Sequence, residues 1–237
     1  YVRRMYLQDL YRFFKLFPNH KDLRNPFDKA ADGASLGYLF ITNPSLARFM
    51  SHEAVEVGRL LFKWRQYDAV VALAESFVKS GAESADLSLL LGNAYLKTGS
   101  YDASYELFSR VVAKNERREQ AMAGLAEASF MLRRYDDVVG ICNRLEAAGH
   151  LSKRLTIYMS LALINSGDVR EGMNRLYRLD YEDGSDRNVK RAIAWGHLMN
   201  HKPDEALRIY DALVADGSDV ADDLLNCGYA KWLLHRN

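Results

Sequence analysis

Proline, cysteine and net charge are all scarce in this chain. Its 237 residues include four prolines and fifteen glycines, which excludes collagen-like and proline-rich architectures. The two cysteines, Cys142 and Cys227, are too few for a disulfide framework, and their positions predict buried, reduced thiols. The 32 basic and 31 acidic residues give a net charge of +1, which argues against a protein that coats nucleic acid or an anionic membrane.

Long apolar runs are also missing. None approaches the roughly 18 residues that are needed to span a bilayer. No segment combines the basic, apolar and small-residue stretches of a secretory signal peptide. The chain starts at Tyr1 rather than at methionine, so we expect it to be part of a longer protein. The lack of an apolar span and of a signal peptide within this sequence predicts a cytoplasmic location with no membrane contact, while the upstream part could carry a targeting segment.

What the chain does contain is a repeat of 34 residues. A Tyr-Asp pair begins at Tyr67, Tyr101 and Tyr135, and the same step continues to Val169 and Pro203. Such self-similarity is the signature of an array of supersecondary units. The units begin at Ser51, Ala85, Glu119, Lys153 and Arg187, and a sixth unit begins at Ala221.

Each unit has the pattern of two helices joined by a tight turn. Apolar positions recur at spacings of three and four, which predicts helices over positions 1–14 and 17–30 of the unit. A small residue at position 8 allows a neighbouring helix to approach closely, and it is Gly58, Gly92, Ala126, Ser160, Ala194 or Gly228. Position 31 carries residue types that accept a left-handed C-cap, namely Gly81, Asn115, Gly149, Asp183 and Gly217.

These residues resemble the tetratricopeptide repeat family. The second unit is the most similar, with Leu-Gly-Asn-Ala-Tyr at 91–95 and Gly-Ser-Tyr-Asp at 99–102. The resemblance implies an all-α fold, a right-handed superhelical solenoid of stacked antiparallel helix pairs. It also implies a non-catalytic scaffold that binds a peptide or protein segment in a concave groove. The two-carboxylate clamp through which some members bind chaperone tails is broken here, because Leu89 replaces its lysine.

Two regions are expected along the chain. Residues 1–50 are predicted to form an N-terminal helix and an irregular insert that packs on the array, and the helix could end an upstream repeat. Residues 51–237 are predicted to form five helix pairs and the first helix of a sixth. That last helix lacks the polar outer face with which repeat arrays end, so either the chain continues or the helix self-associates.

The predicted groove is lined by the inner face of the first helices, at positions 2, 5, 9 and 12 of the unit. This face is mixed in the early units and strongly apolar in the later ones, as is typical of contact surfaces. The candidate binding residues are Arg59, Asn93, Glu127, Phe130, Tyr158, Leu161, Trp195, Tyr229 and Trp232. In the alternative hypothesis the chain is a structural or regulatory segment, and its groove is filled by missing chain or by self-association.

No residue pattern predicts an enzyme, a cofactor or a metal site. His197 and His201 have a metal-compatible spacing, but no glutamate follows His197, so we expect a packed side chain and a helix C-terminal cation. The acidic segment 180–186 has the wrong register for a calcium loop and is predicted to be a solvated turn. Basic pairs such as Arg133 and Arg134 raise the possibility of RNA binding, but nearby acids balance them, so nucleic acid is not expected.

Overall fold

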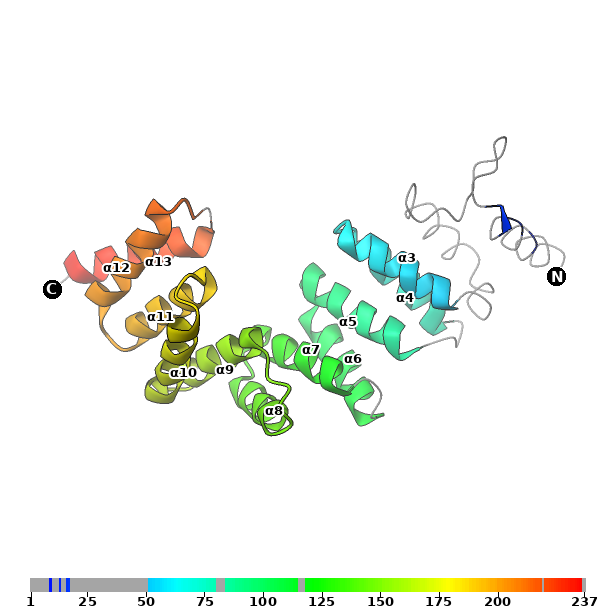
Figure 1. The fold of residues 1–237 in the computed structure, drawn as a ribbon, viewed down its shortest axis with the longest axis horizontal. Helices are drawn as coiled ribbons and strands as arrows, with labels where there is room; N and C mark the ends of the chain where they lie inside the picture. Colours follow the sequence, from blue (N-terminus) through cyan, green and yellow to red (C-terminus); the bar gives the residue numbers. More distant parts are fainter. Residues whose placement is uncertain are drawn as a thin grey trace. The chain divides into compact units, whose positions relative to one another are not determined.

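A computed structural model describes residues 51–79, 84–114, 118–218 and 220–235, together with residues 9, 13, 16 and 17. These residues contain α-helices and turns and no β-strand (Figure 1). The prediction of an all-α fold built from helix pairs is therefore confirmed. Apart from those four positions, the helix and insert predicted over residues 1–50 lie outside the described residues.

The helices follow the 34-residue step. The first helix of each pair starts at the predicted residue, except that the third starts one residue earlier. These first helices are α3 (Ser51–Lys63), α5 (Ala85–Thr98), α7 (Arg118–Met131), α9 (Lys153–Asn165), α11 (Arg187–Met199) and α13 (Ala221–His235). The second helices are α4 (Tyr67–Lys79), α6 (Tyr101–Ala113), α8 (Tyr135–Ala147), α10 (Val169–Glu182) and α12 (Pro203–Ala215).

Local chemistry explains where several of these helices begin. The Ser84 hydroxyl accepts a hydrogen bond from the backbone N–H of Leu87, and a side-chain oxygen of Asp186 accepts one from the N–H of Asn188 at 2.8 Å. Such caps satisfy N–H groups that have no partner inside the helix. The second helices instead carry acidic residues in their first turn, for example Asp68 in α4, where the helix dipole favours negative charge.

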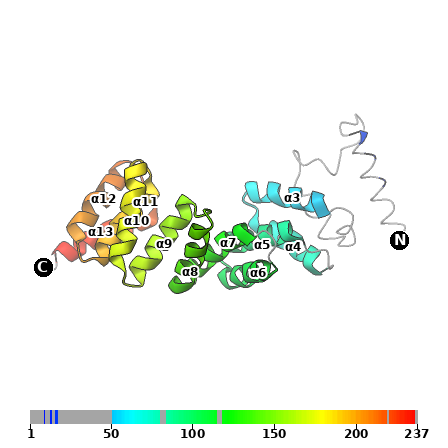
Figure 2. The same ribbon diagram turned by 60° about the horizontal axis from the view of Figure 1, so that its bottom comes forward.

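The chain divides into two compact units, Tyr1–Gly124 and Leu125–Asn237. In the first unit α3, α4, α5 and α6 pack in succession, and α3 also contacts α5. In the second unit α8 to α13 pack in succession, and α11 also contacts α9 and α13 (Figure 2). Each helix is thus covered mainly by helices one or two places away in the chain.

Glycine makes room for a large ring inside the first unit. Gly92 on α5 and Gly124 on α7 both face the ring of Phe108 on α6, which is fully buried. A Cβ atom at Gly92 would lie 2.5 Å from the Cζ atom of Phe108, closer than van der Waals contact allows. The small residue at position 8 therefore acts as the sequence pattern indicates, by letting a neighbouring helix insert a bulky side chain.

A left-handed residue recurs in the turn inside each pair. Its φ angle is positive at Arg65, Gly99, Arg133, Gly167 and His201, which lie 34 residues apart. Only two of the five are glycine, and although a tight turn was predicted here, its left-handed residue was not. At position 31 the predicted left-handed cap is present at Gly149 and Gly217. It is wrong at Asp183, where φ is −148°, and the other two positions lie outside the described residues.

Candidate protein-binding surface

An aromatic pair and an ion-paired carboxylate lie together on α7 and α9. Phe130 and Tyr158 have ring centroids 5.0 Å apart. The Tyr158 hydroxyl donates to Oε1 of Glu127 at 3.4 Å, and the Arg154 guanidinium lies 3.0 Å from Oε2 of the same carboxylate. Glu127 is buried, so both contacts hold a charge that would otherwise be costly to remove from water. The hydrogen bond to Glu127 and the contact with Phe130 therefore fix the position of the Tyr158 ring.

Trp195 on α11 is held in a comparable way. Its Nε1–H donates to Oδ1 of Asn165 at 3.3 Å, and the Asn165 amide nitrogen donates to the carbonyl oxygen of Leu161 at 2.8 Å. Trp195 and Leu161 are both half-buried, and Trp195 packs against the cores on either side of α11. Asn165 was missed as a site residue, although its spacing of four from Leu161 places it on the same face of α9.

The remaining candidates in the second unit lie on α13. Tyr229 and Trp232 are 45% and 49% exposed, and their rings stack with centroids 5.8 Å apart and planes 21° apart. Their exposed fractions set them apart from the half-buried rings on α9 and α11. In this unit the candidate residues thus lie on α7, α9, α11 and α13, and the aromatic side chains on α13 are the most exposed of them.

In the first unit the candidates are Arg59 and Asn93, and both are exposed. The Arg59 guanidinium lies 3.8 Å from a carboxylate oxygen of Asp86, which at this exposure contributes little to stability. The Asn93 amide donates to the carbonyl oxygen of Leu89 at 2.8 Å, within its own helix. Neither contact forms a cluster like that around Tyr158.

A buried ion pair fixes α13 onto α11. The Arg191 guanidinium binds both carboxylate oxygens of Asp223, with Nη2 2.7 Å from Oδ2, and the Ser218 hydroxyl donates to the same oxygen at 2.6 Å. The Asp223 side chain has no exposed surface. The hydrogen bonds from Arg191 hold the pKa of Asp223 below its ordinary value, although burial opposes them. This pair orients the helix that carries Tyr229 and Trp232.

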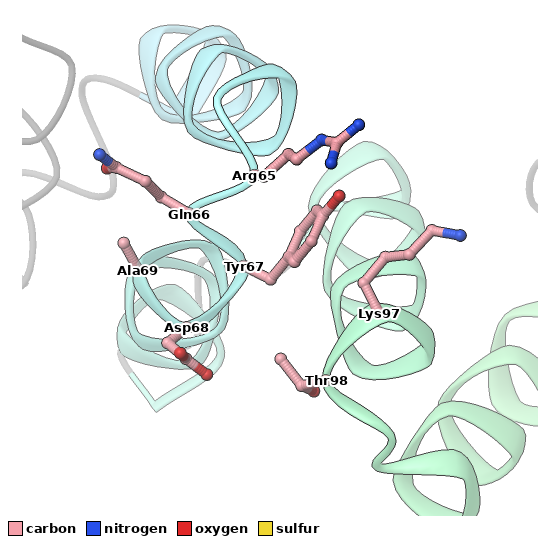
Figure 3. Close-up of a pocket in the computed structure, with 7 residues that line it drawn as sticks. All are labelled: Arg65, Gln66, Tyr67, Asp68, Ala69, Lys97 and Thr98. Atoms are coloured by element: carbon pink, nitrogen blue, oxygen red, sulfur yellow. The ribbon is translucent and has the colours of Figure 1, made fainter. Parts of the chain in front are cut away.

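Two shallow pockets recur at equivalent positions of the repeat. One, of about 540 Å³, is lined by residues 65–69 and by Lys97 and Thr98 (Figure 3). The Tyr67 ring lies between the turn at Arg65 and the end of α5. The other, of about 490 Å³, is lined by residues 133–137 and by Ser166. Because both follow from the turn that every pair shares, they are features of the repeat rather than a distinct site.

Comparison with known families agrees with this architecture. A family model described as "Tetratricopeptide repeat" matches residues 58–115 and, in an overlapping match, residues 89–149. The predicted resemblance to the tetratricopeptide repeat family is therefore confirmed, with the family model covering residues 58–149. No curated protein sequence matches it significantly. Proteins with this repeat are generally non-catalytic scaffolds for protein–protein interaction, and this is the functional class that the fold supports.

Solved structures of tetratricopeptide repeat proteins share the fold. TTC0263 from Thermus thermophilus is 19% identical, with a TM-score of 0.60 over 76% of this chain and 98% of that one. A repeat protein from Parabacteroides merdae is 13% identical, with a TM-score of 0.62 over 94% and 90%. YrrB, described as having an unusual peptide-binding site, is 14% identical, with a TM-score of 0.54 over 76% and 90%.

The histidine, cysteine and acidic residues singled out in the sequence contact other residues of the repeats. His197 is buried, and the Tyr177 hydroxyl lies 3.2 Å from its Nε2 atom. Loss of hydration lowers the His197 pKa, although the Glu205 carboxylate, 2.9 Å from Nδ1, opposes this. The packed side chain expected at this position is therefore present. Both cysteines are buried and free, as predicted. In the acidic turn, Lys153 contacts Asp183 at 2.9 Å and Asp186 at 2.7 Å.

Two further features concern metal ions and membranes. No group of three or more histidine, cysteine, aspartate or glutamate side chains within residues 51–79, 84–114, 118–218 and 220–235 is arranged to hold a metal ion. In that part of the chain no helix is both long and apolar enough to cross a bilayer.

Proposed function

We propose that the second unit binds an apolar segment of a partner protein on the inner face of its first helices. The surface consists of Phe130, Tyr158, Leu161 and Trp195, which we call the aromatic stripe. Two of its residue types, tryptophan and tyrosine, are enriched among the residues that dominate binding energy in protein interfaces. The observation that carries the proposal is that two half-buried rings of the stripe, Tyr158 and Trp195, are each fixed by a hydrogen bond to a side chain of the preceding first helix.

Fixed rings reduce the entropic cost of binding. Immobilising one flexible side chain on binding reduces the binding free energy by about 0.5–1.5 kcal/mol. Trp195 is held by Asn165 and Tyr158 by Glu127, so both are ordered before a partner arrives. Glu127 contributes no free negative charge to the surface, because Arg154 lies 3.0 Å from its carboxylate. We therefore expect the ligand to contact the stripe through aliphatic or aromatic side chains.

The proposed occupant is a peptide segment rather than a small molecule. The two pockets described above lie at the turns, and none of the four stripe residues lines either of them. Anchors on α7, α9 and α11 suit an extended or helical segment that contacts several of them at once. The fold shared with YrrB is consistent with a peptide ligand. Arg59 and Asn93 of the first unit remain predicted contacts.

Selection from a displayed random-peptide library tests the proposal. Peptides selected on the wild-type chain are then titrated against Trp195→Ala and against Tyr181→Ala, whose side chain is 95% exposed on α10. Loss of an anchor of about 2 kcal/mol corresponds to a roughly 30-fold weaker affinity for Trp195→Ala. Tyr181→Ala should bind as the wild type does.

A third variant separates binding from folding. Tyr158→Phe keeps the ring and removes only its hydrogen bond to Glu127, so the helices should remain packed while affinity falls by a smaller factor. Melting temperatures are measured for every variant. If no peptide is enriched, or if a folded Trp195→Ala variant binds the selected peptides as tightly as Tyr181→Ala does, the proposed function is wrong.

A further inference from the structure

Three positively charged residues lie at one edge of the first unit. Lys63 is the last residue of α3, Lys97 is the next to last residue of α5, and Arg65 lies in the turn between α3 and α4. All three are exposed, and none of them forms an ion pair with another residue that the structure describes. We call these three residues the cationic edge. Charges that the chain leaves without a counter-charge attract a partner of opposite sign.

The members of the cationic edge belong to one surface. Lys63 and Lys97 are 34 residues apart, so they occupy the same position of successive units, and their helices contact each other. Arg65 and Lys97 line the same pocket. The carboxylate of Asp68, which also lines this pocket, points away from both of them (Figure 3). An anion at this edge would therefore face several cations at once.

The acidic residues of α3 and α5 lie at the opposite ends of these helices. They are Glu53, Glu56 and Asp86, and each lies in the N-terminal half of its helix. A carboxylate oxygen of Asp86 is 3.8 Å from the guanidinium of Arg59, one turn before the end of α3. The C-terminal ends of the two helices therefore carry positive charge alone.

The repeat itself does not require cations at this edge. A helix dipole favours a basic residue in the last turn, but α7 and α9 have none there. The shape of the pocket recurs at the turn before α8, but its charge does not, because Arg134 there lies 2.7 Å from the carboxylate of Asp137. The residues equivalent to Lys63 and Lys97 in the later first helices are all uncharged, namely Met131, Asn165, Met199 and Leu233.

Arg65 adopts a backbone conformation that a residue with a side chain disfavours. Its φ angle is 60°, and Gly99 and Gly167 show that the same turn accepts glycine. The turn can therefore form without this strain. A strained residue of this kind is a candidate for a functional role of its side chain. Arg65 is exposed, so its guanidinium can bind a carboxylate through two parallel hydrogen bonds.

We propose that the cationic edge binds an acidic segment of a partner protein, through the carboxylates of its aspartate or glutamate side chains. Because Lys63, Arg65 and Lys97 can each contact a separate carboxylate, a run of several acidic residues fits the edge better than a single anion does. The net charge of +1 over the whole chain argues against nucleic acid as the ligand. The edge is distinct from the two-carboxylate clamp, in which Leu89 occupies the lysine position, and the proposal does not rest on peptide binding by the aromatic stripe.

Charge-matched variants test this proposal. The probes are a fluorescein-labelled peptide of alternating glutamate and serine, and the same peptide with glutamine in place of glutamate. Lys63→Gln/Lys97→Gln removes two charges from the edge. The control, Arg170→Gln/Arg208→Gln, removes two exposed charges from α10 and α12, where neither arginine forms an ion pair with a described residue. Fluorescence anisotropy measures binding to the purified chain at low and at physiological salt, and a melting temperature is recorded for each variant.

The glutamate peptide should bind the wild type and the control similarly, and its affinity should fall as salt rises. It should bind Lys63→Gln/Lys97→Gln at least about tenfold more weakly, which corresponds to 1.4 kcal/mol. The glutamine peptide should not bind. Absence of binding of the glutamate peptide to the wild type overturns the proposal, and so does an equal loss of affinity in the control. If single-stranded oligothymidylate binds the wild type more tightly than the glutamate peptide does, the proposed protein ligand is wrong and the edge is assigned to nucleic acid.

A glycine substitution separates binding from stability. Arg65→Gly removes a cation and relieves the left-handed conformation, so it should weaken binding of the glutamate peptide without lowering the melting temperature. Arg133→Gly makes the same backbone change at an equivalent turn, where Asn165 stands in the place of Lys97, and should bind as the wild type does. If the two glycine variants bind the peptide equally tightly, Arg65 is not part of the site and the edge as defined is wrong.

This test and that of the aromatic stripe can fail separately. Apolar peptides selected on the wild type should bind Lys63→Gln/Lys97→Gln unchanged, because Tyr158 and Trp195 are intact in it. If this variant loses the glutamate peptide and keeps the selected peptides, both proposals are supported. A wild type that binds the selected peptides and not the glutamate peptide overturns only the acidic site.

Discussion

Removal of the Asp223 carboxylate is the sharpest test of how the second unit is held together. Asp223→Ala leaves the Arg191 guanidinium without its bidentate partner and the Ser218 hydroxyl without its acceptor. Breaking a buried pair by removing one partner costs about 3–5 kcal/mol. The Arg191 side chain keeps 24% of its surface exposed and can be rehydrated, so we expect about 3 kcal/mol, at the lower end of that range.

Arg191→Ala should cost more, because it strands a carboxylate with no exposed surface. The double variant should lose clearly less than the sum of the two single losses, since it removes both charges. Urea unfolding of all four proteins at pH 7 gives the coupling free energy. If the single losses add to within about 0.5 kcal/mol, the pair is not coupled and the reasoning is refuted.

The same pair predicts a dependence on pH. The folded state lowers the Asp223 pKa below its ordinary value of 3.8, so the folded protein binds fewer protons at this site than the unfolded chain does. The stabilisation is therefore complete above pH 3.8 and is lost as pH falls through the lower, folded-state pKa. Asp223→Ala should show a correspondingly smaller loss of stability on acidification.

Three further outcomes are expected. Gly92→Ala places a methyl group 2.5 Å from the Phe108 ring, and overpacking of this kind should lower the free energy of unfolding by about 1–3 kcal/mol, as measured in urea. Arg133→Gly should raise the melting temperature by relieving a left-handed arginine, a net gain of about 0.5–1 kcal/mol, whereas Gly167→Ala at the equivalent turn should lower it. If the two substitutions changed the melting temperature in the same direction and by the same amount, the left-handed turn would be contradicted. Burial raises the pKa of the Cys142 thiol to about 12, so iodoacetamide at pH 8 should alkylate it far more slowly in the folded chain than in urea.

The helix pairs were predictable because their determinants are local. Apolar spacing and first-turn acids such as Asp68 depend on residues close in sequence, and the 34-residue step then repeats the information. The left-handed turn inside each pair was not predictable from residue type. Arginine at 65 and 133 and histidine at 201 disfavour that conformation, and the packing of the two helices imposes it.

The chemistry of the inner face was only partly predictable. Periodicity places Glu127 and Trp195 on one face, but it does not show that Arg154 compensates the first or that Asn165 orients the second. Those contacts join residues about 30 positions apart on successive first helices, so they depend on how closely the repeats stack. For the same reason, Val55, which occupies the predicted groove position 5 of the first unit, is instead buried.

Packing between near neighbours in the chain has a mechanical consequence. In the second unit the main contacts of each helix are with helices one or two places away, so no distant segments need to be brought together. Under tension applied at the end of α13, this helix would detach first and α12 next, each with a small increase in length. Each detached helix would repack on the helices that remain folded, so the chain would shorten again quickly when the load is removed.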